Sequence, residues 1–328
     1  MKIALISMEV IPGRPDLNAA SMHRKIAEAK AAGADIAVFP ALSLSGLFLG
    51  GVWKQAAFLR DCAAYAEEIA AAADGITVVF GNAAEAEICT GVRRTLMEVR
   101  DGVLREVAQT PLHGTGNTFA PLLYELPNEN IILAADASPF PVCFDVRALA
   151  DTAREKRKHI FYVNALGLQD KGKTIYTFAG RAQVFSADGM RVLMSPAYTE
   201  GMTVVDTESM PAPLTAAKEA PIAPKYRMLR YAVQKFLERI HMERVVIGIS
   251  GGIDSAVAAA LYVDAIGADK VLLVNMPSQF NSATTKGLAA QLAENLGCRH
   301  MIVPIEESVA HTVDQLTTVP IMGKCATE

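Results

Sequence analysis

The segment that most constrains the fold of this chain is 246–256, which reads Val-Ile-Gly-Ile-Ser-Gly-Gly-Ile-Asp-Ser-Ala. The residues that lead into it, 244–249, are mostly Val and Ile, as expected of a parallel strand buried on both faces. Gly251 and Gly252 permit a tight turn with positive φ. The apolar, alanine-rich run at 254–266 is typical of a helix. The segment therefore predicts a strand, a tight turn and a helix in direct succession.

The turn has the composition of a phosphate-binding loop. A helix N-terminus preceded by glycines and hydroxyl side chains forms an anion site. Asp254 places a carboxylate beside it, and a Mg²⁺ ion bound to phosphate usually takes one or two carboxylates. The sequence therefore predicts ATP and Mg²⁺ as cofactors, with Asp254 as the metal ligand. The residues assigned to the ATP loop are Gly248, Ile249, Ser250, Gly251, Gly252, Ile253, Asp254 and Ser255.

The order of residues separates this loop from two commoner phosphate motifs. It matches neither G-x-G-x-x-G nor the P-loop G-x-x-x-x-G-K-[ST], because no lysine follows the glycines. The alternative interpretation is a plain strand-to-helix turn that contains serines by chance. A match of six residues in the right strand–turn–helix context favours the phosphate loop.

The sequence around this loop predicts a doubly wound parallel sheet. Two consecutive βαβ units are expected, with a ligand at the carboxyl ends of the strands. The loop 276–282 leaves the second strand at that edge, so Met276 and Ser278 are candidate adenosine contacts; the alternative is an ordinary loop with a helix N-cap. The expected strands are 244–249, 270–276 and 300–305, and the expected helices are 254–266 and 284–296.

We expect this second domain to be incomplete. Three strands are expected before Glu328, whereas sheets of this kind usually have five or more. The segment 310–328 has no clear periodicity. The expectation is that a partner chain completes the site or that the chain is a fragment of a longer protein.

The first half of the chain predicts an α/β sandwich of its own. The segment 206–226 has four prolines among small and charged residues, which is typical of a linker. It separates a domain at 1–205 from one at 227–328. After the linker, one helical face is apolar and is expected to pack against the sheet of the second domain; it consists of Leu229, Val233, Phe236, Leu237 and Ile240.

In the first domain, Asp101-Gly102 predicts a hairpin turn. The expected strands are 3–7, 35–40, 76–81, 94–100, 103–107, 130–135, 159–164, 182–186 and 191–194, and the expected helices are 17–32 and 54–73.

Composition excludes several classes of function. The chain has 328 residues, of which 31 are Lys or Arg and 35 are Asp or Glu, so it lacks the basic excess of a nucleic-acid binder. No apolar run reaches the length of a membrane span, and the expected location is the cytoplasm. The cysteines lack C-x-x-C spacing, which favours reduced thiols over a disulfide framework or a zinc site. They are Cys62, Cys89, Cys143, Cys298 and Cys325.

Both halves resemble known families. The Ser-Gly-Gly-Ile-Asp-Ser loop at 250–255 resembles the pyrophosphate loop of the ATP pyrophosphatases, which activate a carbonyl by adenylylation. The first half resembles the carbon–nitrogen hydrolase (nitrilase) superfamily, and the two together resemble glutamine-dependent NAD synthetases. The matching segments of the first half are Ile-Ala-Leu-Ile-Ser at 3–7, Ala-Asp-Ile-Ala-Val-Phe-Pro-Ala-Leu-Ser-Leu-Ser-Gly at 34–46, Ala-Ser-Pro-Phe at 137–140, Tyr-Val-Asn at 162–164, Gly-Leu-Gln-Asp at 167–170 and Val-Phe-Ser-Ala-Asp-Gly at 184–189.

The resemblance implies a glutaminase triad of Cys, Glu and Lys in the first domain, and this chain departs from it at each member. Ala41 stands where the general base would be, and Val107 where the lysine would be. The chain between 119 and 137 is too short for the usual cysteine segment. Cys143 imitates that segment but follows the Ser-Pro-Phe step instead of preceding it. It is the one candidate nucleophile, and we expect glutaminase activity to be absent or vestigial.

The resemblance implies NAD⁺ synthesis by ATP-dependent amidation of deamido-NAD through an adenylylated intermediate. Free ammonia, rather than glutamine, is the expected nitrogen source. The partners expected are deamido-NAD, ATP and ammonia or glutamine, without nucleic acid or membrane, and a homo-oligomer is possible by resemblance. One alternative is a non-catalytic or fragmentary nucleotide-binding homologue. Another is a different ATP pyrophosphatase activity, such as tRNA thiolation or GMP synthesis, against which the nitrilase-like half argues.

Overall fold

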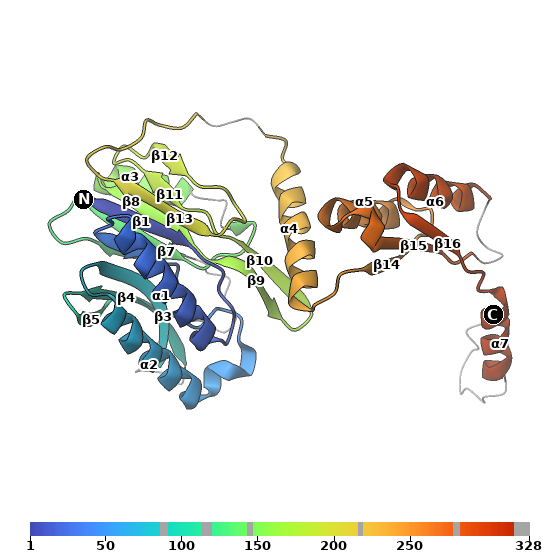
Figure 1. Cartoon of the computed structure of the whole chain (residues 1–328), viewed down its shortest axis with the longest axis horizontal. Helices are drawn as coiled ribbons and strands as arrows, with labels where there is room; N and C mark the ends of the chain where they lie inside the picture. Colours follow the sequence, from blue (N-terminus) through green and yellow to red (C-terminus); the bar gives the residue numbers. More distant parts are fainter. Residues whose placement is uncertain (86–90, 113–119, 143–146, 216–218, 278–282, 318–328) are drawn as a thin grey trace. The chain divides into compact units, whose positions relative to one another are not determined.

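The computed structural model describes residues 1–85, 91–112, 120–142, 147–215, 219–277 and 283–317. The chain divides into two compact units, Met1–Pro221 and Ile222–Glu328 (Figure 1). The segment between the last strand of the first unit and the first helix of the second lies within the predicted linker 206–226. Strand β13 ends at Asp206, and helix α4 begins at Ala223.

Two β-sheets form the centre of the first unit. Their strand orders are β13-β1-β2-β3-β4-β5 and β12-β11-β8-β7-β6, and β9 and β10 form a separate hairpin. Strands β1, β2 and β3 are parallel to one another, as are β7 and β8. The strands are β1 (Lys2–Ser7), β2 (Ile36–Val38), β3 (Thr77–Glu85), β4 (Val92–Arg100), β5 (Val103–Pro111), β6 (Leu122–Glu125), β7 (Ile131–Asp136), β8 (His159–Asn164), β9 (Leu166–Lys171), β10 (Thr174–Ala179), β11 (Gln183–Phe185), β12 (Arg191–Met194) and β13 (Gly201–Asp206).

The alternation of side chains along β7 shows how the layers stack. Leu133 and Ala135 belong to the large core that also contains β1 to β4, whereas Ile132 and Ala134 pack with helix α3 (Arg147–Lys156). Helices α1 (Pro15–Ala31) and α2 (Ala56–Ala72) pack against each other, and α2 lies on β3 and β5 (Figure 1). The order helix, sheet, sheet, helix confirms the predicted α/β sandwich.

The second unit contains a three-stranded parallel sheet with the order β14-β15-β16. Strand β14 (Val245–Gly248) leads into α5 (Ile253–Ile266), and β15 (Val271–Asn275) leads into α6 (Ala283–Leu296) and then β16 (Arg299–Ile302). Both helices contact β15 and enclose one apolar core. The two predicted βαβ units are therefore confirmed. The core consists of Ile249, Ala259, Val271, Leu273, Ala289 and Ala293.

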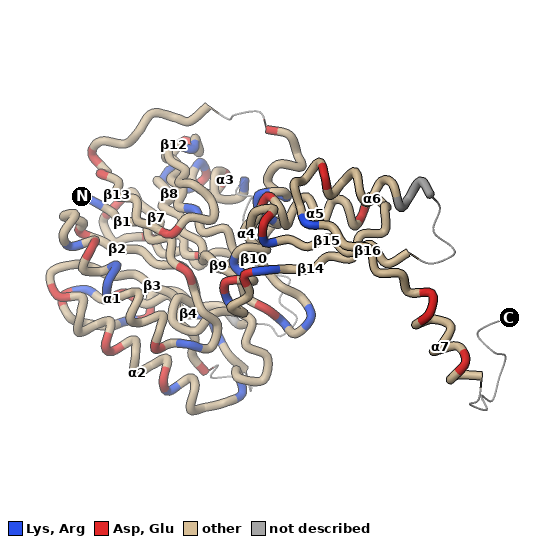
Figure 2. The backbone as a smooth tube through the Cα atoms, turned by 45° about the vertical axis from the view of Figure 1, so that its right-hand side comes forward, with Lys and Arg blue, Asp and Glu red and all other residues tan. Residues whose placement is uncertain are grey.

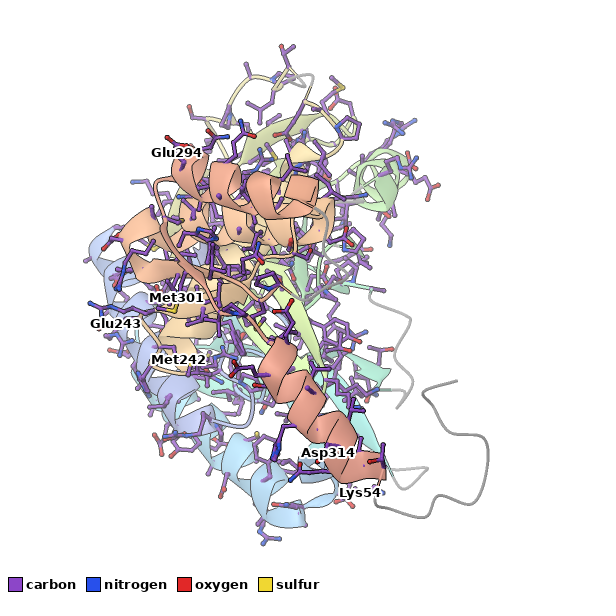
Figure 3. All side chains as sticks on the ribbon, turned by 90° about the vertical axis from the view of Figure 1, so that its right-hand side faces the viewer. Lys54, Met242, Glu243, Glu294, Met301 and Asp314 are labelled. Carbon is purple, nitrogen blue, oxygen red and sulfur yellow. The ribbon has the colours of Figure 1, made fainter. Side chains whose placement is uncertain are left out.

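The opposite face of this sheet is exposed, which corrects the expectation of a first strand buried on both faces. Val246 is 68% exposed and Met301, labelled in Figure 3, is 47% exposed. The physical reason is that α5 connects β14 to β15 and α6 connects β15 to β16, so both connections run in the same direction across the sheet. Because such connections share one hand, both helices cover the same face.

Helix α4 (Ala223–Arg239) packs against α5 rather than against the sheet, which corrects the expected packing of its apolar face. Its buried residues are Tyr231 and Leu237, whereas Leu229, Phe236 and Ile240 are exposed. The reason is that α5 already covers the sheet on that side.

A further helix, α7 (Glu306–Thr317), begins before and runs into the segment for which no periodicity was expected. Its charged residues are acidic, and Figure 2 marks them in red. Among the helices that the structure describes, none is long and apolar enough to cross a bilayer.

Candidate functional site

The loop between β14 and α5 has the geometry that its sequence predicts. Ile249 continues the parallel pairing beyond the strand, because its N–H donates to the carbonyl of Val274 at 2.8 Å, and its side chain is buried in the core. Gly251 then adopts φ +83°, a conformation that L side chains rarely take. Gly252 is extended and caps α5 without a side-chain hydrogen bond. The turn is thus anchored at its start and depends on glycine at its apex.

Two serines hold the loop in shape. The Ser250 N–H lies 3.3 Å from the Ser255 hydroxyl oxygen, and the Gly252 N–H donates to the Ser250 hydroxyl at 3.2 Å. The Ser255 hydroxyl donates to the Gly252 carbonyl at 3.0 Å. These bonds fold the chain back over the start of α5, so that the loop forms a cradle around the first helical N–H groups.

The cradle has the donor set expected of a phosphate site. The first N–H groups of a helix have no intrahelical partner, and here no side chain caps them. Residues 252, 253 and 254 are exposed, so an anion can reach these groups. Asp254 stands in the first turn of α5. One exposed carboxylate beside phosphate donors fits Mg²⁺ held mainly by phosphate oxygens and water.

A closed metal site would need several protein side chains as ligands. No group of three or more His, Cys, Asp or Glu residues that could hold a metal occurs among the residues that the structure describes.

Met276 lies next to this cradle. Its methyl carbon would be 3.3 Å from a Cβ added to Gly248, which places it over the end of β14. The side chain is 49% exposed, so one of its faces is open to a ligand. Of the two predicted adenosine contacts, Met276 is therefore brought to the loop. Ser278 lies outside the described residues.

The positions predicted for the general base and the lysine of a glutaminase triad carry no acid–base group. Ala41 is fully buried, and its N–H donates to the Asp136 carbonyl at 3.1 Å, which joins the ends of β2 and β7. Val107 is the extra residue at a bulge between β4 and β5 and packs against the apolar core. Neither side chain can exchange a proton.

The cysteines of the first unit add no nucleophile within the described residues. Cys143 and Cys89 lie outside those residues. Cys62 lies on the buried face of α2, and burial raises the pKa of its thiol to about 12, with a smaller contribution from Asp61. It is therefore a protonated thiol at neutral pH and a poor nucleophile.

A buried polar group at the end of β7 was not foreseen from the sequence. The Asp136 carboxylate accepts hydrogen bonds from the Ala137 N–H and the Ser138 hydroxyl, both at 2.7 Å, and from the Tyr162 hydroxyl at 2.9 Å. Asn164 brackets Ser138, accepting from its N–H at 3.0 Å and donating to its carbonyl at 2.9 Å. Burial raises the pKa of Asp136, although these hydrogen bonds oppose the shift. The group fixes the loop that follows β7.

Known proteins resemble this chain both in its second unit alone and over most of its length. Residues 225–322 match the family model described as NAD synthase. Over 93% of the chain, the sequence is 28% identical to a glutamine-dependent NAD(+) synthetase of Xylella fastidiosa and to one of Rhodobacter capsulatus. The matched regions cover 64% and 62% of these two proteins, so the chain spans about two thirds of their length at most.

Solved structures support the fold. The glutamine-dependent NAD+ synthetase of Acinetobacter baumannii, solved with ADP, superposes on 99% of this chain and 69% of its own, with a TM-score of 0.80 and 23% identity. An amidase of the nitrilase superfamily from Nesterenkonia covers 63% of this chain, with a TM-score of 0.50 and 18% identity. The first of these matches shows the same fold throughout, and the second shows a nitrilase-like part.

Proposed function

The chain is a homologue of the glutamine-dependent NAD(+) synthetases over most of its length, and from this premise we propose that it takes part in the ATP-dependent amidation of deamido-NAD. In this reaction ATP adenylylates the nicotinate carboxylate, and ammonia displaces AMP to form the amide. The observation that carries the proposal is the cradle formed by 248–255, in which a glycine with positive φ and two serines present the free N–H groups of α5.

The cradle acts on the leaving group. Pyrophosphate departs as the carboxylate attacks the α-phosphorus, and negative charge builds up on its oxygens. The N–H groups at the start of α5 donate to those oxygens, and the serine bonds keep the groups in place without reorganisation. Mg²⁺ held by Asp254 would neutralise the same charge. Met276 would pack against the adenine ring.

Free ammonia is the proposed nitrogen source. Ala41 has no proton-accepting group, and losing a member of a catalytic triad usually costs several orders of magnitude in rate. The role of Cys143 as a nucleophile stays a prediction.

We further propose that residues 1–205 form the nitrilase-like domain and residues 227–328 the nucleotide domain, joined by the linker 206–226. The working location is the cytoplasm, and a homo-oligomer is the proposed assembly.

A second candidate function is nucleotide binding without catalysis. It is favoured by the second unit, in which no described residue can be assigned to the deamido-NAD side of the reaction. The two candidates differ in whether bound ATP is cleaved.

Pyrophosphate exchange tests both candidates in one experiment. The full chain is incubated with Mg-ATP, labelled pyrophosphate and deamido-NAD, and the label that enters ATP is measured without any nitrogen source. Exchange that depends on deamido-NAD would support the adenylylation proposed here. ATP binding by calorimetry without exchange would support the non-catalytic homologue, and the absence of ATP binding would contradict both.

A further inference from the structure

The first unit contains a buried arginine that no described residue pairs with. Arg94 lies on β4 and is 6% exposed. Alternate residues of a strand share a face. Glu98, four residues along β4, accepts a hydrogen bond from Tyr124 of β6 at 3.0 Å, and β6 belongs to the second sheet. Arg94 therefore projects into the space between the two sheets.

The strand register places Arg94 beside the vestigial glutaminase position. Gly81 pairs with Leu96, and Ala83 pairs with Arg94, so these positions are neighbours on the inner face of the first sheet. A Cβ on Gly81 would lie 2.3 Å from the Cα of Ala41. The segment that follows β2 therefore crosses the inner face next to Arg94.

The carboxylate whose charge acts on Arg94, that of Asp136, is engaged in hydrogen bonds of its own. Burial lowers the pKa of Arg94, and the charge of Asp136 opposes this effect without forming an ion pair. Position 136 continues the alternation of Ile132 and Ala134, which face α3 on the other side of the second sheet. Both carboxylate oxygens of Asp136 already accept hydrogen bonds. Asp136 therefore attracts the Arg94 guanidinium from the other side of the second sheet and does not contact it.

Glu98 on the same face of β4 shows how this fold treats a buried charge. Its carboxylate is fully buried and accepts hydrogen bonds from Arg100 at 2.9 Å, from Arg105 at 2.6 Å and from Tyr124. A buried ion without such partners costs several kcal/mol. Among the residues that the structure describes, none forms a hydrogen bond or ion pair with the Arg94 side chain, so its five donors are available to a ligand.

We propose that Arg94 is the anchor of a binding site for a small monocarboxylate between the two sheets of the first unit. The planar guanidinium fork matches the two oxygens of a carboxylate. A monocarboxylate brings one negative charge to the guanidinium, whereas inorganic phosphate carries more negative charge at neutral pH. Because the charge of Asp136 also acts on Arg94, the ligand with less negative charge is favoured.

Thermal unfolding of the full chain tests the site with acetate and propionate as probes. A ligand that binds only the native state raises the Tm with concentration. Sodium chloride and sodium phosphate at equal ionic strength serve as the anion controls. We expect the carboxylates to raise the Tm by more than the control salts do at the same ionic strength. Equal shifts from all four salts would overturn the proposal.

Variants identify the residue. Arg94→Met keeps the length of the side chain and removes the charge and the donors, and we expect it to abolish the carboxylate-dependent shift. Arg94→Lys keeps the charge without the fork and should weaken binding about ten- to hundred-fold, as expected for a lost charged hydrogen bond. Arg105→Met removes an arginine that is 52% exposed and pairs with Glu98, and it should bind like the wild type.

Direct binding is measured on the unmodified chain, so that an unfolded variant does not decide the outcome. Carbon-13-labelled acetate is titrated into the protein, and the line width of its carboxyl resonance is followed. Broadening that unlabelled propionate reverses is the expected result. A carboxyl line that stays as narrow as with an unrelated protein, or an Arg94→Met variant that broadens it equally, would show that Arg94 is paired only with water.

Discussion

The loop at 248–255 and the inner face around Ala41 differ in the chemical groups on which a site there would depend. The loop uses backbone N–H groups, one glycine with φ +83° and two serines that bond only to the loop itself. The predicted glutaminase triad would need the side chains of three residues far apart in sequence, and Ala41 and Val107, which stand at two of the predicted positions, supply no acid–base group. A site whose donors are backbone N–H groups is kept as long as the turn keeps its shape. A site made of side chains disappears with single substitutions while the fold around it persists.

The largest expected effect is on the apex of the loop. Gly251→Val introduces a β-branched side chain at φ +83°, so the turn must rearrange and the donors at the start of α5 lose their arrangement. We expect ATP affinity, measured by calorimetry, to fall at least about a hundred-fold. Gly287→Ala is the matched control, because a Cβ there meets no atom within 4 Å. Unchanged ATP affinity in Gly251→Val would mean that the loop does not hold the phosphates.

Restoring a carboxylate in the first unit should not restore chemistry. Ala41→Glu forces a longer side chain into a fully buried position beside Arg94, and overpacking of this kind should reduce the free energy of unfolding by about 1–3 kcal/mol. Urea denaturation measures that change, and glutamate release from glutamine measures activity. Because Val107 still replaces the lysine, we expect no release. A gain of glutaminase activity would show that Ala41 alone had silenced the site.

The metal ligand should have an intermediate effect. Asp254→Asn removes the carboxylate beside the cradle but keeps its shape, and we expect about a ten-fold loss of ATP affinity that is seen with Mg²⁺ and not in EDTA. Asp269→Asn makes the same charge change on an exposed residue of the second unit and should have no effect. An equal loss with and without Mg²⁺ would assign Asp254 to the loop structure instead.

The smallest expected effect is at Met276. Met276→Ala should weaken ATP binding about two- to five-fold, because one apolar contact with the adenine ring is lost. Met301→Ala removes a side chain of nearly equal exposure, 47% against 49%, from the neighbouring strand β16. The two variants should therefore differ in ATP affinity and agree in stability. Equal affinities would remove Met276 from the site.

The parts of the fold that follow local rules could be predicted from the sequence. The two βαβ units, the hairpin at Asp101-Gly102 and the layered first unit all rest on periodicity and turn residues, and they are present. The position of α4 could not be predicted, because its apolar spacing shows that a face is to be covered but not which element covers it. The bare face of the second sheet was missed because an apolar strand looks the same whether one face or both are covered.

The same limit applies to the sites. The loop could be predicted because its residues are contiguous in the sequence. The positions of Arg94 and Asp136 could not be predicted, because these residues come near Ala41 only through the pairing of β4 with β3 and the contact between β2 and β7. An arginine that shares a strand face with Val92 and Leu96 is the signal that could have identified the buried cation.

The proposed function is tested most directly by determining which nitrogen source supplies the amide of NAD⁺. The full chain is given Mg-ATP, deamido-NAD, ¹⁵N-ammonium and unlabelled glutamine together, and the isotope in the amide of NAD⁺ is determined by mass spectrometry. We predict NAD⁺ that carries ¹⁵N and no glutamate beyond the background. Unlabelled NAD⁺ formed together with glutamate would contradict it, because glutamine would then be hydrolysed in a unit that lacks the expected base.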